Sequence, residues 1–175
     1  MEKLLEIMKN RRSVRQYTGD SVSTEDLNKV LKAGLLSPTG KSIKPWEFIV
    51  VRDKGMLEKL ALSRNGAADM LKTADCAIVV IADETKTDVW IEDCSIAMAY
   101  MHLMADSLGL GSCWIQGRQR IAADGQKSDE YVRDMLGYPE GYNLEAILSL
   151  GIPLSKKEPH DMPDVMDKKI HYENF

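Results

Sequence analysis

Apolar residues recur at helical spacing in three stretches of the chain, and each stretch predicts a helix. The first ends near Asn10, and the third covers residues 56–62. The second is better marked, because Ser23 can cap it and Asp26, three residues later, completes a capping-box pattern. Pro38 ends this second helix. The apolar positions that define the first two helices are Leu4, Leu5, Ile7 and Met8, and then Leu27, Val30, Leu31, Gly34 and Leu35.

Four shorter apolar runs have the length and composition of strands. They cover residues 48–51, 76–82, 112–115 and 145–150. The run 76–82 is apolar throughout, as expected of a strand that is buried on both faces. Helices separate these strands along the chain, so the pattern predicts a mixed α and β fold.

The stretch from Val89 to Leu108 predicts a long helix with apolar residues on nearly every face. We expect Thr87 or Asp88 to cap its start and Gly109 to end it. A helix that is apolar all round must be buried all round, and a small domain has difficulty covering five turns by itself. We therefore predict a homodimer; the alternative is the central helix of a monomer.

The chain has 175 residues, the size of one domain, and a formal net charge of −4, which argues against nucleic acid as a partner. Cys76, Cys94 and Cys113 are too few and too widely spaced for a disulfide framework or a zinc site, so we expect buried free thiols. Because the N-terminus lacks an apolar signal core, we expect a cytoplasmic chain without membrane association. The polar residues 155–175 predict a C-terminal extension that wraps a partner subunit.

The run Arg11-Arg12-Ser13-Val14-Arg15 is basic in a chain that is acidic overall. Guanidinium groups fit phosphate oxygens, and the serine adds a neutral donor. This run indicates a site for a phosphorylated small molecule, although a solvated basic turn would have the same composition.

Two further segments place glycine and small polar residues at the ends of predicted elements. In the segment 37–46, two prolines fix a loop that can bring backbone amides, hydroxyls and two lysines to a flat ligand, although a plain loop needs no function. The segment 109–117 contains the Gly-Ser-Cys-Trp sequence found in papain-like proteases. Too few residues follow Cys113 to supply the distant His and Asn of such an enzyme, so we reject that interpretation.

The sequence shows no pattern of catalytic acid, base or nucleophile. It has no Gly-x4-Gly-Lys-Ser/Thr phosphate loop and no Gly-x-Gly-x-x-Gly motif. His102, His160 and His171 are scattered and have no metal-ligand spacing. If the chain is an enzyme, we expect a cofactor to supply the chemistry.

Taken in order, these segments resemble the motifs of the nitroreductase family of flavin-dependent oxidoreductases. The resemblance covers nearly the whole chain and rests on residues 11–15, 37–51, 108–117 and 150–153. It implies a single α+β domain over 1–175, built as a three-layer α/β/α arrangement of helices around a mostly antiparallel central sheet. It also implies a homodimer that holds FMN at its interface and exchanges C-terminal segments.

The resemblance implies a role for each segment. Arg11 and Ser13 would contact the FMN phosphate and ribityl chain, and Arg15 would lie toward the pyrimidine edge, where a cation suits the charge of the reduced flavin. The loop at 38–40 would come from the partner subunit and lie along the isoalloxazine, and Gln116 and Gly117 would present backbone to the flavin N5 region. The full set of implied cofactor-binding residues is Arg11, Arg12, Ser13, Arg15, Pro38, Thr39, Gly40, Ser42, Lys44, Ile115, Gln116, Gly117, Lys157 and His160.

Two positions differ from the pattern of many family members. Ser42 stands where those members have Asn, and serine reaches less far, so one polar contact would be lost or replaced by water. Lys44 stands where they have Gln. We hypothesise that Lys44 stabilises the reduced, anionic flavin and raises the FMN potential.

The implied activity is a ping-pong reaction. NADH or NADPH would pass a hydride to FMN and leave, and an electron-poor acceptor such as a nitroaromatic compound or a quinone would then take two electrons. Three alternatives remain open: a flavin-destroying or dehalogenating member, a non-catalytic FMN store or redox sensor, and a phosphate-ligand binder without flavin.

Overall fold

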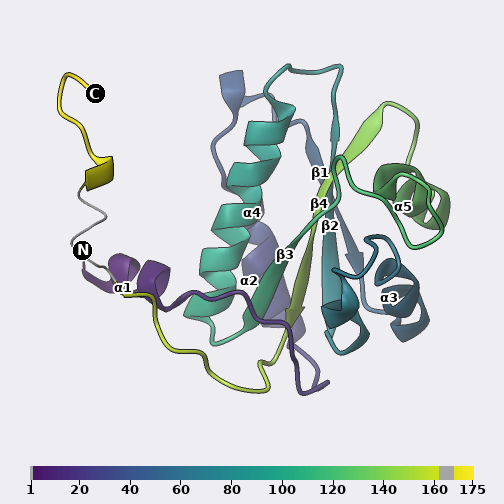
Figure 1. The fold of residues 1–175 in the computed structure, drawn as a ribbon, viewed down its shortest axis with the longest axis horizontal. Coiled ribbons are helices and arrows are strands. Elements are labelled where there is room, and N and C mark those ends of the chain that lie inside the picture. Colours follow the sequence, from purple (N-terminus) through teal and green to yellow (C-terminus); the bar gives the residue numbers. More distant parts are fainter. Residues whose placement is uncertain (1, 162–167) are drawn as a thin grey trace.

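The protein is described by a computed structural model that covers residues 2–161 and 168–175. Within these residues, five α-helices and four strands form the fold (Figure 1). The helices are α1 (Glu2–Asn10), α2 (Thr24–Leu35), α3 (Lys54–Leu60), α4 (Trp90–Ser107) and α5 (Ser128–Leu136), and the strands are β1 (Trp46–Val51), β2 (Cys76–Asp83), β3 (Gly111–Gln116) and β4 (Tyr142–Gly151).

The strands form one sheet in the order β1-β2-β4-β3, and each neighbouring pair is antiparallel. Helices α2 and α4 cover one face of the sheet, and α3 and α5 cover the other (Figure 1). Two apolar clusters follow this division: Val30 and Met98 belong to one, and Leu60 and Val132 belong to the other. The predicted α+β fold with helices around an antiparallel sheet is therefore confirmed. The apolar run of β2 is buried on both faces because β2 is an inner strand of the sheet and helices cover both sides of the sheet (Figure 1).

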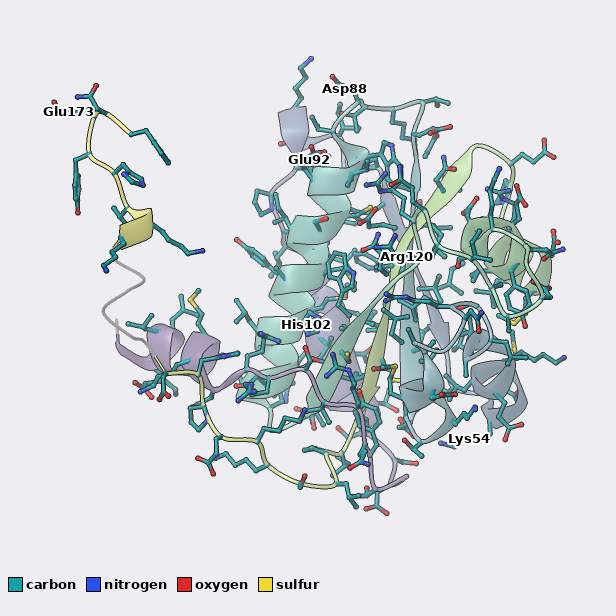
Figure 2. The ribbon with its side chains drawn as sticks, in the orientation of Figure 1. Lys54, Asp88, Glu92, His102, Arg120 and Glu173 are labelled. Atoms are coloured by element: carbon teal, nitrogen blue, oxygen red, sulfur yellow. The ribbon has the colours of Figure 1, made fainter. Side chains whose placement is uncertain are left out.

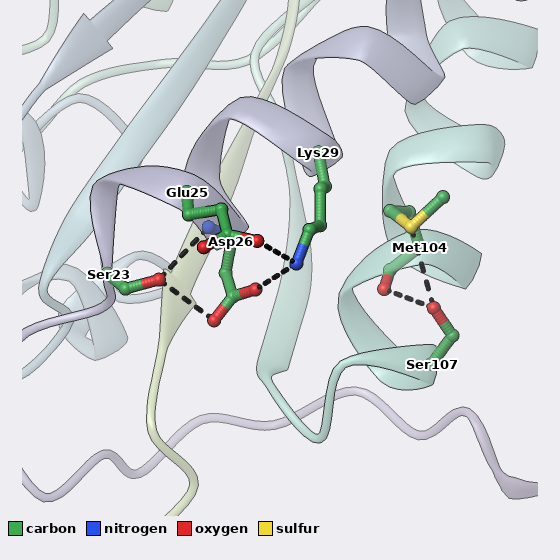
Figure 3. A network of polar contacts seen from close by, with 6 residues as sticks. All are labelled: Ser23, Glu25, Asp26, Lys29, Met104 and Ser107. Carbon is green, nitrogen blue, oxygen red and sulfur yellow. Dashed lines mark hydrogen bonds and ion pairs between the residues drawn. The ribbon is translucent and has the colours of Figure 1, made fainter.

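Helix α2 begins where the capping-box pattern predicts. Ser23 Oγ accepts a hydrogen bond from the backbone N of Asp26 at 3.0 Å and also contacts the Asp26 carboxylate at 2.9 Å (Figure 3). Lys29 then pairs with Glu25 and Asp26 across the first two turns (Figure 3). The side-chain cap satisfies an N–H group that has no partner inside the helix.

The predicted cap of α4 is wrong. Val89 is the N-cap residue, and no side chain caps the helix. Thr87 Oγ1 instead accepts from the backbone N of Val89 at 3.3 Å, so it stabilises the turn before the helix. The start of α4 is covered by another segment of the chain, which contacts it through Asp93, as described below.

Burial around α4 is uneven within one chain. Ala97, Met98 and Met101 are fully buried against the sheet, whereas Tyr100 is 41% exposed and Leu103 is only partly buried. Between α1, α2 and α4 lies an apolar groove of about 330 Å³ that includes Tyr100 and Leu103. One chain therefore leaves part of this helix uncovered.

The C-terminal extension first runs beside the segment that follows α1. Leu154 N donates to the carbonyl of Gln16 at 3.0 Å, and His160 N donates to the carbonyl of Lys9 at 2.9 Å. The part of the predicted extension at 162–167 lies outside the described residues. Residues 168–175 stand away from the sheet and its helices in Figure 1, with exposed Tyr172 and Phe175 side chains.

The three cysteines are buried and free, as predicted. Among the residues that the structure describes, no helix has the length and apolar character needed to cross a bilayer.

Candidate functional site

The free edge of β3 is the framework of the candidate site. One side of β3 pairs with β4, and Ser13 bridges the start of its other side, where Val14 N donates to the outward-facing carbonyl of Ser112 at 2.9 Å. Backbone groups alternate between the two edges of a strand, so the amides of Trp114 and Gln116 also point outward. Within the described part of the chain, no other backbone group bonds to these two amides from outside the sheet. Such an edge offers hydrogen-bond donors to a ligand.

The basic run lies at the start of this edge and meets the C-terminal extension. Lys157 Nζ donates to the carbonyl of Ser13 at 2.9 Å, and the Arg12 guanidinium donates to the carbonyl of Glu158. Arg11, Arg15 and Lys157 all lie close enough to Cys113 to lower the pKa of its thiol, against a larger rise caused by burial. The chain thus gathers several cations around one strand end, a charge arrangement that suits an anion. The predicted residues brought together here are Arg11, Arg12, Ser13, Arg15, Lys157 and His160.

A hollow of about 650 Å³ opens beside this cluster. Arg15, Cys113 and Trp114 line one part of it, and Arg64 and Gly66 line another. A hollow of this size can hold a nucleotide-sized ligand. The wall near residue 64 was not predicted from the sequence, although the Asn-Gly pair at 65–66 is a turn signal and Gly66 has a φ of +66°.

The far end of β3 is held by a polar network. Trp114 Nε1 donates to Gln116 Oε1 at 2.8 Å, and Gln116 Nε2 donates to the carbonyl of Glu145 at 3.3 Å. The same carbonyl accepts from the amides of Gly117 and Arg118 at 3.1 and 3.0 Å. Burial raises the pKa of the Glu145 carboxyl, while Gln116 and Arg118 act in the opposite direction. The network fixes the backbone of residues 116–117. Of these two residues, Gln116 is the one whose backbone amide points away from the sheet.

Ile115 lies in this segment but faces the other way. Its side chain is 1% exposed and belongs to the core on the side of α3 and α5. Its neighbour in the ladder is Ile147 of β4. The structure therefore turns the side chain of Ile115 away from the free edge of β3.

His102 of α4 supports the strand from behind. Its Nδ1 lies 2.8 Å from Ser112 Oγ, and Figure 2 shows the ring between α4 and β3. Burial, with a smaller contribution from the nearby charge of Arg11, lowers the pKa of His102 to about 4. A neutral histidine thus lies directly behind Ser112, the residue that Ser13 bridges.

The predicted loop at 38–44 lies elsewhere in the chain. Gly40 contacts the start of α4, where its N donates to Asp93 Oδ1 at 2.9 Å. His102, which lies beside the basic run, is nine residues further along the same helix, or about 13 Å at ~1.5 Å per residue. One chain alone therefore does not bring Pro38, Thr39, Gly40, Ser42 and Lys44 to the cluster of cations.

Comparison with known proteins identifies relatives over the full chain. The sequence profile described as "Nitroreductase family" matches residues 8–64 and 54–152. A protein of Archaeoglobus fulgidus, provisionally named NADH dehydrogenase/NAD(P)H nitroreductase, is 36% identical over an alignment of 180 positions that covers the whole of both chains.

Solved structures show the same fold. An FMN-dependent nitroreductase from Clostridium difficile is 46% identical, with a TM-score of 0.94 over 98% of this chain and 99% of that one. A nitroreductase from Desulfovibrio desulfuricans, solved in complex with FMN, is 24% identical, with a TM-score of 0.77 over 98% and 97% of the two chains. This second likeness is one of fold.

We expect His102 to make the protein less stable as the pH falls from about 6.5 toward 4. The folded pKa is about 4 and the ordinary value is 6.5, so the stabilising contribution is complete above pH 6.5 and is lost as the unfolded chain binds the proton first. The loss amounts to roughly 3 kcal/mol in the free energy of unfolding at pH 4.

Urea unfolding of the wild type and of His102→Asn, at pH 7 and pH 4, measures this effect. Asparagine can keep a hydrogen bond to Ser112 but does not titrate, so the variant should lose less stability on acidification. Equal losses in the two proteins would contradict the prediction.

Proposed function

Because this chain belongs to the nitroreductase family, we propose that it is an FMN-dependent enzyme that uses NADH or NADPH to reduce small electron-poor acceptors. The observation that carries the proposal is that a cluster of basic residues lies at the start of the free edge of β3. The cluster suits a phosphate, and the outward amide of Gln116 lies at the other end of the same edge. The residues present therefore fit FMN.

Within this proposal, the basic run holds the phosphate end of FMN. Arg11, Arg12 and Ser13 supply charged and neutral donors, and Lys157 is already directed to the carbonyl of Ser13. His160 follows on the same extension. The extension thus completes the anion site from a distant part of the sequence.

Residues along β3 would hold the ring end of FMN. The backbone amide of Gln116 points outward and can donate to the ring. Its position is fixed because Gln116 Nε2 and the backbone N of Gly117 both donate to the carbonyl of Glu145. Arg15 lines the neighbouring hollow, where its charge can stabilise the anion that reduction leaves near the pyrimidine edge. When bound, FMN supplies the two-electron chemistry, and the protein supplies position, charge and access.

We also propose that the active form is a homodimer with FMN between the protomers. The groove along α4 and the exposed leucines of α1 form an apolar surface that a second copy can cover. The loop at 38–44, which lies away from the basic cluster of its own chain, would then reach the partner's FMN. The exposed tail at 168–175 would wrap the partner.

The acceptors are nitroaromatic compounds, quinones or similar electron-poor molecules, reduced in a ping-pong reaction in which donor and acceptor use one face in turn. Because donor and acceptor would bind the same face of the flavin, we expect them to compete with each other. A non-catalytic FMN store or redox sensor is the second candidate, because the sequence shows no pattern of catalytic acid, base or nucleophile. A flavin-destroying or dehalogenating activity is a third.

We expect the purified protein to bind about one FMN per chain and the flavin bands to bleach on anaerobic addition of NADH or NADPH. Steady oxidation of the donor after a quinone is added would distinguish the enzyme from a store. Bleaching without turnover would favour the store, and a colourless protein that cannot be loaded with FMN would contradict the proposal. Arg11→Ala should raise the Kd for FMN by about tenfold or more, whereas the exposed Arg120→Ala should not.

We expect the dimer to depend on the uncovered face of α4. Leu103→Glu places a charge in the apolar groove and should shift the protein toward monomer in sedimentation experiments at micromolar concentration. Leu62→Glu, at an exposed leucine outside the groove, is the matched control and should leave the association unchanged. A wild-type protein that sediments as a stable monomer would refute the proposed assembly.

We expect Lys44→Gln to lower the midpoint potential of bound FMN by an amount on the order of 20–30 mV, because it removes a cation that favours the reduced flavin. The potential is measured by anaerobic titration with a reference dye. Lys41→Gln, in the same loop, is the control. An unchanged or higher potential in Lys44→Gln would show that Lys44 does not have this role.

A further inference from the structure

Asp93 is a buried carboxylate that accepts a hydrogen bond from a loop distant in the sequence. The residue lies in the first turns of α4 and is 2% exposed. Its Oδ1 accepts from the backbone N of Gly40 at 2.9 Å, across 53 positions of sequence. The carboxylate lies near the start of α4, yet it does not cap the helix, which has no side-chain cap. It accepts a hydrogen bond from the loop instead.

The loop that Asp93 holds has an uncommon backbone. Lys41, Ser42 and Lys44 have φ values of +52°, +58° and +53°, in the left-handed region that side chains other than glycine seldom adopt. Such conformations cost free energy and persist only where the surroundings impose them.

Most hydrogen bonds of the loop are local. Ser42 N donates to the carbonyl of Thr39 at 3.1 Å, Ile43 N to that of Gly40 at 3.1 Å, and Lys44 N to Thr39 Oγ1 at 3.2 Å. Among the hydrogen bonds of the described residues, the bond from Gly40 to Asp93 is the one that ties positions 38–44 to another element.

The loop also approaches α4 closely at Gly40. A Cβ atom built on Gly40 would lie 2.8 Å from Val89 Cγ2, so only glycine lets the backbone come this near. The contact and the hydrogen bond act at the same residue. Together they fix the middle of the loop against the start of the helix.

We propose that Asp93 is a positioning residue that sets the conformation in which the loop at 38–44 meets the partner subunit's FMN. The inference rests on the proposed function, since it concerns the same cofactor. It adds a residue that does not touch the flavin and acts through the Gly40 amide. Oδ2 of Asp93 has no hydrogen-bond partner among the described residues, so an asparagine amide placed there would lose no bond that the carboxylate makes.

Asp93→Ala should therefore raise the Kd for FMN by about tenfold, measured by quenching of flavin fluorescence, and should shift the midpoint potential of the FMN that remains bound. Asp93→Asn should stay within about threefold of the wild type, because its carbonyl can still accept from Gly40. Cys94→Ala, a change at the next buried residue of α4, is the control for packing and should leave both quantities unchanged. If Asp93→Ala does not fold, Asp93→Ser replaces it, because the serine side chain is too short for its hydroxyl to reach the Gly40 amide.

Amide hydrogen exchange in the flavin-free protein tests the hydrogen bond itself. Exchange at Gly40 should be faster in Asp93→Ala than in the wild type, Asp93→Asn or Cys94→Ala. The inference is overturned if the wild type binds FMN and Asp93→Ala binds it equally well, or if asparagine fails to restore what alanine loses. A wild-type protein that binds no FMN overturns the proposed function and, with it, the role of Asp93. This outcome differs from failure of the Asp93 inference alone, because no variant would then bind FMN.

Discussion

The free edge of β3 is the constraint on which the candidate site depends. A single bridge from Ser13 closes the start of that edge, and within residues 2–161 and 168–175 the rest of the edge has no backbone partner. Because backbone groups alternate along a strand, the strand that places the basic run at one end also turns the amide of Gln116 outward at the other. Four steps of about 3.3 Å separate Ser112 from Gln116, so a ligand with a phosphate at one end and a ring at the other can meet both.

Helix α4 supports this edge, and different parts of its surface make different contacts. Its buried face, including Met98 and Met101, forms core with the sheet. His102 lies behind β3 and stays neutral because burial disfavours its charged form. Asp93, near the other end, holds the loop at 38–44. Its remaining apolar side, with Tyr100 and Leu103, is left uncovered, and this combination explains why the helix has apolar residues in nearly every direction.

Local signals were sufficient for most of the fold. Ser23 and Asp26 predicted the start of α2, and the run 76–82 predicted a central strand, because both patterns depend on residues close together in the sequence. The same approach failed at the start of α4. Thr87 and Asp88 have the composition of a cap, but the helix starts beneath a loop from residues 38–44, and that contact is not local. The turn at 65–66 was visible as an Asn-Gly pair, yet its place opposite Arg15 depends on how α3 and β3 pack.

The sequence by itself determined four of the five helices and all four strands of the described residues, the basic run, the strand with a fully apolar pattern and the family that these motifs resemble. The elements, the basic run and the apolar strand follow from periodicity, capping or composition over a short stretch, and the family follows from the resemblance of the motifs taken in order. Only the tertiary structure decided that Lys157 joins Ser13, that Ile115 faces the core, and that Asp93 accepts from Gly40. Those contacts join residues far apart in the chain or depend on which face of a strand is covered. They are settled when the sheet and its helices pack together, and no local pattern records them.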